Sequence, residues 1–231
     1  MKKIGLIGGI TWQSTQLYYQ YLNTKVAASL GGKHSCRCII ESVDFADISK
    51  KQAAGDWEEL HNDMAEIALR LENAGADIIL IGANTMHLSV PTMKKSVSVP
   101  ILHIAEVAGK AVIEKGCQKV VLLGTKYTME LDFYKDILKN KFGIEVLIPN
   151  DIDRDIIHNI IYTELAKGII TQDSKQQYVD IIKKAEEDGA EGVILGCTEI
   201  PLLIKEGDCD IPTFDTTKEH AYAAVEFALG Q

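Results

Sequence analysis

The chain has 231 residues, of which 46% are hydrophobic and 25% charged, and its formal net charge at pH 7 is −9. This composition is ordinary for a globular protein and excludes a largely disordered chain. The negative charge and the lack of clustered Lys and Arg argue against nucleic acid as a partner. No apolar segment approaches the length of a transmembrane helix, so we expect no membrane association. The negative net charge does not exclude a small anionic substrate, because backbone amides and one or two lysines can make the local potential of a cleft positive.

Short apolar runs at 4–7, 78–81, 120–123 and 193–195 indicate buried strands. Amphipathic stretches between them predict helices after Asp56 and over 155–165, 174–188 and 217–229. Asp56 followed by Glu59 is typical of a capping box. The alternation of strands and helices predicts parallel sheets whose two faces are covered by helices.

A weak internal repeat predicts two similar halves. Residues 3–8 resemble 119–124, residues 74–85 resemble 189–199, and residues 99–101 resemble 211–213, at offsets of 116, 114 and 112. Offsets so nearly equal, in unchanged order, are typical of two related units. We therefore expect an α/β fold of two pseudo-symmetric parallel-sheet halves that face each other across a central cleft. The first half is expected over 1–98 plus 211–231, and the second over 99–210.

Ligands of open parallel sheets bind beyond the carboxyl ends of the strands. The repeat places four loops at such ends: 8–11, 83–85, 125–128 and 197–199. Gly8 and Gly9 follow a strand, but the spacing Gly-x-Gly-x-x-Gly of dinucleotide sites and a Walker sequence are both missing. These glycines instead predict a tight turn whose backbone amides approach a small anion.

Cys197, directly after the strand 193–195, is the strongest candidate for a reactive side chain. The alternative is a buried structural thiol, since cysteine is among the most buried residue types. We expect a helix N-terminus here that lowers the thiol pKa, which suits a nucleophile or a carbon base.

The other cysteines have weaker cases. Cys36 and Cys38 share one strand face and are expected in the core, Cys117 follows a helix-to-strand turn, and acidic neighbours should raise the pKa of Cys209. The odd number of cysteines and their spacing favour reduced thiols in the cytoplasm.

Two histidines have open assignments. His87 is equally compatible with a base and with a capping or packing residue. His220 could orient a neighbour of the thiol or lie on a helix surface. No group of His, Cys, Asp and Glu has metal-ligand spacing, so no metal is expected.

Five segments together are similar to the aspartate/glutamate racemase family, and closest to its broad-specificity branch. They are 8–15, 84–87, 124–129, 196–199, and 214–216 with His220. The resemblance implies a homodimer that uses no pyridoxal phosphate or other cofactor and interconverts L- and D-aspartate, L- and D-glutamate, or both. It also implies that a thiolate removes the α-proton from one face while a second acid protonates the other face.

The resemblance also implies the residues of the site. Cys197 is the thiol acid/base, Ala83 stands at the position of the second acid/base, and Thr85 lies beside it. Gln52 and Lys167 are expected near the side-chain carboxylate of the substrate, and His220 supports the site. The substrate-binding positions are Gly9, Ile10, Gln52, Asn84, Thr85, Thr125, Tyr127, Thr128, Lys167, Thr198 and Glu199.

Ala83 is a departure from the family pattern, because a methyl group cannot transfer a proton. Ala83 is explained equally by natural variation and by an engineered replacement of Cys or Thr. Thr85, or a water held by Asn84 and Thr85, would serve this face poorly, so activity could be reduced or confined to one face. Two alternatives therefore stand: a one-thiol decarboxylase or isomerase of dicarboxylates, and a non-catalytic binder of acidic amino acids.

Overall fold

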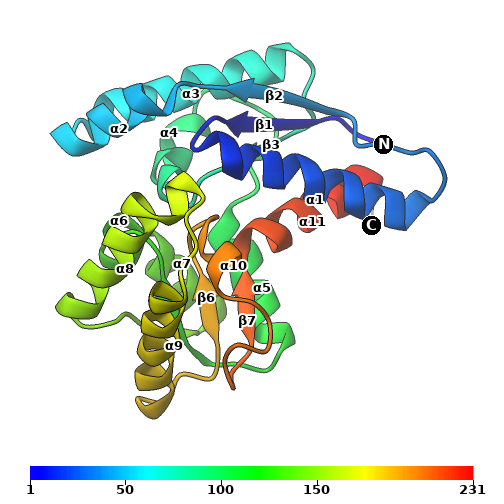
Figure 1. Cartoon of the computed structure of the whole chain (residues 1–231). Coiled ribbons are helices and arrows are strands. Elements are labelled where there is room, and N and C mark those ends of the chain that lie inside the picture. The colour runs from blue at the N-terminus through cyan, green and yellow to red at the C-terminus, as the bar shows by residue number, and fades with distance from the viewer. Residues whose placement is uncertain (231) are drawn as a thin grey trace. The chain divides into compact units, whose positions relative to one another are not determined.

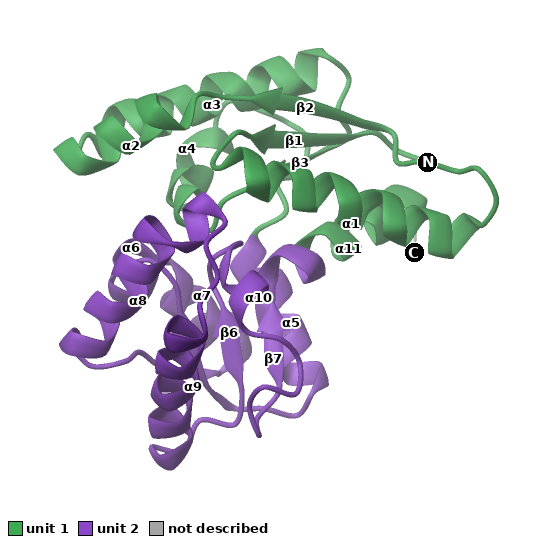
Figure 2. Cartoon of the chain, in the orientation of Figure 1, with its two compact units in different colours: residues 1–103, 220–231 green, residues 104–219 purple. Residues whose placement is uncertain are grey.

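The computed structural model describes residues 1–230, which form two compact units (Figure 2). Unit 1 comprises residues 1–103 and the C-terminal segment from 220, and unit 2 comprises residues 104–219. The boundaries differ from the expected 98/99 and 210/211. Residues 99–103 belong to unit 1, because Ile101 forms a parallel bridge with Ile79 of the first sheet. Residues 211–219 belong to unit 2, because the strand at 213–215 pairs with 193–195.

Unit 1 is built on a three-stranded parallel sheet in the order β2-β1-β3 (Figure 1). Ile7 and Ile79 contact one hydrophobic cluster, whereas Leu6 and Leu80 contact another. This alternation follows from the period of two in a strand, so both faces of the sheet are buried. The strands are β1 (Ile4–Gly8), β2 (Cys38–Ser42) and β3 (Ile78–Ile81).

Helices cover both faces of this sheet. The helix α3 (Trp57–Asn73) contributes to the first cluster, and α1 (Trp12–Leu30) and α11 (Thr216–Leu229) contribute to the second. Asp56 caps α3 by accepting a hydrogen bond from the Glu59 amide, as the capping-box pattern predicts. The other elements are α2 (Phe45–Ala54), the 3-10 helix η1 (Thr85–Ser89) and α4 (Val90–Met93).

Unit 2 has a four-stranded parallel sheet in the order β5-β4-β6-β7. Helices α8 and α9 pack on one face, and α5 and α7 pack on the other. The strands are β4 (Lys119–Leu123), β5 (Glu145–Leu147), β6 (Val193–Leu195) and β7 (Thr213–Asp215). The helices are α5 (Ile104–Glu114), α6 (Lys126–Glu130), α7 (Asp132–Phe142), α8 (Asp151–Thr163), η2 (Leu165–Lys167), α9 (Gln172–Glu187) and α10 (Ile200–Leu203).

The expected α/β class with two parallel sheets is confirmed, as are the four predicted strands. The repeat also recurs in the hydrogen bonds of the two sheets. The Gly82 amide donates to the Ile7 carbonyl at 2.8 Å, and the Gly196 amide donates to Leu123 at 2.6 Å. Ala83 and Cys197, each directly after one of these glycines, therefore occupy equivalent positions in the two units. Within residues 1–230, no helix is long and apolar enough to cross a membrane.

Candidate functional site

In unit 1, the loop after β1 and the loop after β3 lie at the same edge of the sheet, because the two strands pair in parallel. Ser14, in the first turn of α1, donates a hydrogen bond from Oγ to the Gly82 carbonyl at 2.6 Å. The buried Ser14 hydroxyl thus ties the start of α1 to the end of β3. This contact joins two of the predicted loops, and Ser14 was missed as a site residue although it lies within the 8–15 segment.

Gly9 makes the turn after β1. Its φ is +88°, and a Cβ there would lie 2.1 Å from the Val43 carbonyl oxygen, so only glycine fits. The Gly9 amide donates to Thr15 Oγ1 at 2.7 Å. The predicted tight turn is confirmed, but this amide is engaged by Thr15 and does not point to an open anion site. Ile10 follows it and is buried.

The turn after β3 carries buried polar side chains. Ala83, Asn84 and Thr85 are each no more than 9% exposed. Gln52, on α2, is also buried and donates from Nε2 to the Met86 sulfur at 3.5 Å. The structure therefore brings Gln52 to the turn that carries Asn84 and Thr85, as one half of the predicted substrate site requires.

The His87 ring forms hydrogen bonds with the backbone of this turn. Its Nδ1 lies 3.0 Å from the Ala83 carbonyl oxygen and 3.2 Å from that of Asn84, which makes Nδ1–H the donor. Burial lowers the pKa of His87 to about 4, so the ring is neutral. Since the ring is 1% exposed, the structure favours the capping and packing assignment over the base.

His220, at 0% exposure, extends the same buried network and is not on a helix surface. Its Nδ1 lies 2.8 Å from the Tyr18 hydroxyl, and its Nε2 lies 2.9 Å from the Leu102 carbonyl oxygen. Burial, followed by the neighbouring His87, lowers its pKa to about 3. The rings of His87 and His103 are 4.8 Å apart. The expectation that His220 orients a neighbour of the thiol stays a prediction.

In unit 2, the loops after β4 and β6 also share one edge of their sheet. Thr125 caps α6 by accepting a hydrogen bond from the Thr128 amide at 3.4 Å, and their hydroxyl oxygens are 3.3 Å apart. A Cβ on Gly124 would lie 2.9 Å from the Gly196 carbonyl oxygen, so the two loops approach closely. The structure thereby places Thr125 and Thr128 beside the loop of Cys197.

Cys197 and Glu199 form the polar centre of this edge. The thiol donates to Oε2 of Glu199 at 2.9 Å, and the Thr198 hydroxyl donates to the same oxygen at 2.7 Å. Thr198 and Glu199 are buried, while Cys197 is partly exposed. A thiol and a hydroxyl thus converge on one carboxylate at the end of β6.

The expected lowering of the Cys197 pKa is wrong. Burial raises the pKa well above its usual range, and the negative charge and hydrogen bond of Glu199 raise it further. The amides of Thr198 and Glu199 act in the opposite direction but are outweighed. The helix that follows, α10, has four residues and begins only at Ile200, which leaves little helix dipole at the thiol. Cys197 is therefore a thiol in the ligand-free protein.

An aromatic group on α8 and α6 adjoins the thiol, and sequence analysis missed most of it. Burial, then the charge that Cys197 carries as a thiolate, raises the pKa of Tyr162 to about 12. The ring of Tyr162 is 4.7 Å from that of His158, which is 6.4 Å from that of Tyr127. Only Tyr127 belonged to a recognised segment. Tyr162 and His158 lie in an amphipathic helix whose pattern carries no catalytic signal.

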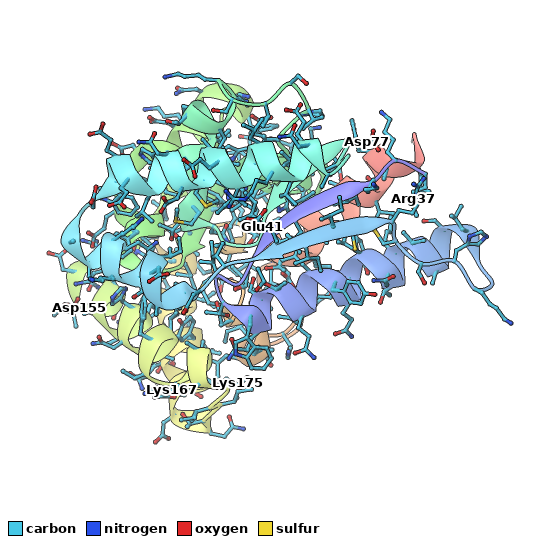
Figure 3. The ribbon with its side chains drawn as sticks, turned by 90° about the horizontal axis from the view of Figure 1, so that it is seen from above. Arg37, Glu41, Asp77, Asp155, Lys167 and Lys175 are labelled. Carbon is cyan, nitrogen blue, oxygen red and sulfur yellow. The ribbon has the colours of Figure 1, made fainter. Side chains whose placement is uncertain are left out.

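Lys167 ends the 3-10 helix η2, which packs against α10, and its side chain is exposed at the edge of unit 2 (Figure 3). Gln52 belongs to unit 1 and Lys167 to unit 2. Their shared role toward a substrate carboxylate therefore stays a prediction. Among residues 1–230, no group of three or more His, Cys, Asp or Glu could hold a metal ion.

Comparison with known proteins gives consistent matches over nearly the whole chain. The sequence model of the Asp/Glu/Hydantoin racemase family matches residues 7–224. A proposed Asp/Glu racemase from Yersinia pestis is 45% identical, with a TM-score of 0.93 over 99% of this chain and 100% of that one. An aspartate racemase homologue from Pyrococcus horikoshii is 39% identical, with a TM-score of 0.86 over 99% of this chain and 100% of that one.

The curated relatives are more distant and are matched over part of their length. The broad specificity amino-acid racemase RacX of Bacillus subtilis is 28% identical over 166 residues, which are 70% of this chain and 69% of RacX. A glutamate racemase of Leptospira borgpetersenii is 26% identical over 71% of this chain and 62% of that protein. Both of these proteins are amino-acid racemases by name.

Proposed function

Because the chain belongs to the Asp/Glu/Hydantoin racemase family, we propose that it interconverts the L and D forms of aspartate, glutamate or both without a cofactor. The observation that carries this proposal is the hydrogen bond from the Cys197 thiol to the Glu199 carboxylate. This contact supports the proposal, because a thiol with a carboxylate as proton acceptor is found at the carboxyl end of a parallel strand. Such strand ends are where open α/β sheets bind ligands.

Glu199 supplies what Cys197 needs to act as a carbon base. In the free protein the proton resides on the sulfur, because burial and the Glu199 charge disfavour the thiolate. The ammonium group of a bound amino acid, placed closer to the sulfur than to the Glu199 carboxylate, stabilises the thiolate more than the carboxylate and so favours transfer of this proton to Glu199. The resulting thiolate removes the α-proton of the substrate, and the reprotonated thiol returns a proton to the same face in the reverse reaction.

The other face of the α-carbon is assigned to the turn after β3, where Ala83 occupies the position equivalent to Cys197. Ala83 has no exchangeable proton, so we assign proton delivery on this face to the Thr85 hydroxyl or to a water. This assignment predicts slow inversion, because each missing acid or base typically costs roughly 10²–10⁴-fold. The substrate contacts are assigned to Gly9, Ile10, Gln52, Asn84, Thr85, Thr125, Tyr127, Thr128, Lys167, Thr198 and Glu199, with His220 supporting.

The remaining parts of the proposal rest on the resemblance to the family. They are a homodimer, a cytoplasmic location and the lack of pyridoxal phosphate. Analytical ultracentrifugation tests the homodimer. The lack of pyridoxal phosphate is tested by measuring the activity of metal-free, phosphate-free protein whose absorption spectrum shows no pyridoxal phosphate.

The function is tested with L- and D-aspartate and L- and D-glutamate in D₂O, by following Cα deuteration and chirality together. Deuteration with inversion is the expected result. Exchange on one enantiomer without inversion would restrict the protein to one working face and favour a one-thiol enzyme. Ligand-dependent thermal stabilisation without exchange would contradict racemisation and favour a binder of acidic amino acids.

A further inference from the structure

Two cysteines lie close together in the chain at the start of β2 in unit 1. Cys38 is the first residue of β2 and pairs with Ile4, and Cys36 precedes it by two residues. Both are partly exposed and pack against the hydrophobic cluster that contains Leu22 and Val26. Side chains two residues apart in an extended chain point to the same side. The two thiols are therefore neighbours on one face.

The backbone of this pair is held on both sides. The Cys36 amide donates to Oδ1 of Asn23 on α1 at 3.0 Å, and the Ile4 amide donates to the Arg37 carbonyl at 2.9 Å. Arg37, between the two cysteines, is exposed and lies at the same end of the strands of unit 1 as Asp77 (Figure 3). These hydrogen bonds fix the backbone on which both thiols are carried.

The two thiols are chemically unequal. A hydrogen bond from the Cys36 thiol lowers the pKa of Cys38 to about 7, although burial opposes this. The same hydrogen bond raises the pKa of Cys36. Burial raises the pKa of Cys117, Cys197 and Cys209. Of the five cysteines, Cys38 therefore has the largest thiolate fraction near neutral pH. An attacking thiol works best when its pKa is close to the ambient pH.

We propose that Cys36 and Cys38 form a thiol–disulfide exchange site for small disulfides of the glutathione type, with Cys38 as the nucleophile and Cys36 as the resolving thiol. The geometry that points to it is two partly exposed cysteines, one at the start of β2 and one two residues before it, that pack against the same hydrophobic cluster. This site is independent of the proposed racemase reaction.

The exchange balances in two steps. The Cys38 thiolate attacks one sulfur of the small disulfide, forms a mixed disulfide and expels one small thiolate, which takes up a proton. Cys36 then loses its proton, attacks the Cys38 sulfur, closes the Cys36–Cys38 disulfide and expels the second small thiolate. In total the small disulfide is reduced to two thiols and the protein dithiol is oxidised. The negative charge of Cys38 is absent from the mixed disulfide, so Cys36 ionises more readily in the second step.

The spacing makes the closed form reversible. In an extended chain, residues two apart have Cα atoms roughly 6.4–6.8 Å apart, which is at the upper end of the range that disulfides bridge. A disulfide at this limit is strained and therefore more easily reduced. The pair also lies at the opposite end of β2 from Ser42, next to which Val43 contacts the Gly9 turn. Closure should therefore leave racemase activity unchanged.

The test is to incubate the full chain with oxidised glutathione at pH 7.5, block remaining thiols with iodoacetamide, and map the peptides by mass spectrometry. The expected product is a Cys36–Cys38 disulfide that reduced glutathione reopens. Cys36→Ser should stop at a mixed disulfide on Cys38, and Cys38→Ser should react at least 10-fold more slowly at Cys36. Cys209→Ser is the matched control and should behave as the native chain.

Three results would overturn the proposal. The first is a native chain that stops at the mixed disulfide, which excludes Cys36 as the resolving thiol. The second is equal reactivity of Cys36→Ser and Cys38→Ser. The third is that Cys38 of the native chain reacts with iodoacetamide no faster than Cys209 at pH 7. This measurement uses the native chain alone and so does not depend on the folding of a variant.

Discussion

The Cys197 thiol donates a 2.9 Å hydrogen bond to the carboxylate of Glu199, two residues later in the chain. The contact keeps the proton on sulfur in the free protein and also provides the group that can accept it. A buried thiol alone would be inert, and a thiolate alone would cost free energy next to a carboxylate. In the proposed reaction, the charge of the bound substrate shifts the proton from Cys197 to Glu199, so the thiolate forms only when the substrate is present.

Replacing Glu199 by Gln removes the negative charge but keeps the size of the side chain. We expect the pKa of Cys197 to fall but to stay above its ordinary value, because burial, the largest cause of the rise, is unchanged while the charge and the charged hydrogen bond of Glu199 are gone. Racemase activity should fall by about 10²-fold, since the proton acceptor is lost. The pH dependence of Cys197 alkylation measures the pKa, with Cys209 in the same sample as control. An unchanged or raised Cys197 midpoint would contradict the assignment.

Ala83→Cys should strengthen inversion. The substitution places a thiol at the position equivalent to Cys197, and a positioned acid or base typically contributes roughly 10²–10⁴-fold. The measurement is the rate of chirality change with L- and D-aspartate. Ala83→Ser is the matched control, because it adds a group of similar size that is a much weaker acid. Equal rates for both variants would argue against acid–base transfer at this position.

The buried histidines predict acid sensitivity. The folded-state pKa values of His87 and His220, about 4 and about 3, lie below the ordinary value near 6.5, so the unfolded chain binds more protons between these limits. Stability is therefore present above pH 6.5 and is lost as the pH falls through 4, by roughly 3 kcal/mol for His87 alone. Urea unfolding between pH 7 and 4 should show a shallower dependence in His87→Gln. The exposed His34→Gln serves as control, and an unchanged slope in His87→Gln would refute the prediction.

Gly9→Ala should destabilise unit 1. The new Cβ would lie 2.1 Å from the Val43 carbonyl oxygen at a φ of +88°, so backbone must move. We expect a loss of at least about 2 kcal/mol. Gly32→Ala is the matched control, because its φ is +62° but no atom lies within 4 Å of the new Cβ. Thermal unfolding of both variants measures the difference, and equal melting temperatures would exclude the close approach.

Sequence patterns predicted the parts of the fold that have a strong local signal. Continuous apolar runs marked four strands, and the repeat predicted that Ala83 and Cys197 are equivalent. The short strand β7 has three residues and was assigned to the wrong half, because nothing local shows that Phe214 packs with Ile194. Tertiary pairing determines such a strand.

The candidate site was predictable in residue identity but not in electrostatics. Glu199 was named as a substrate contact, yet its effect on Cys197 depends on a side-chain rotamer and on burial, which no sequence pattern encodes. The neighbourhood of Tyr162 and the buried network of His87, His103 and His220 join segments distant in the chain. Such contacts arise only from the three-dimensional fold.

The most direct test of the central claim is Cα deuterium incorporation from D₂O into L- and D-aspartate and L- and D-glutamate by Cys197→Ala, with Cys209→Ala as control. We expect measurable exchange in the native chain and in Cys209→Ala. Exchange should fall by at least roughly 10²-fold in Cys197→Ala, because the thiol is the acid/base of one face. Exchange that persists at the native rate in a folded Cys197→Ala would show that Cys197 does not transfer the proton.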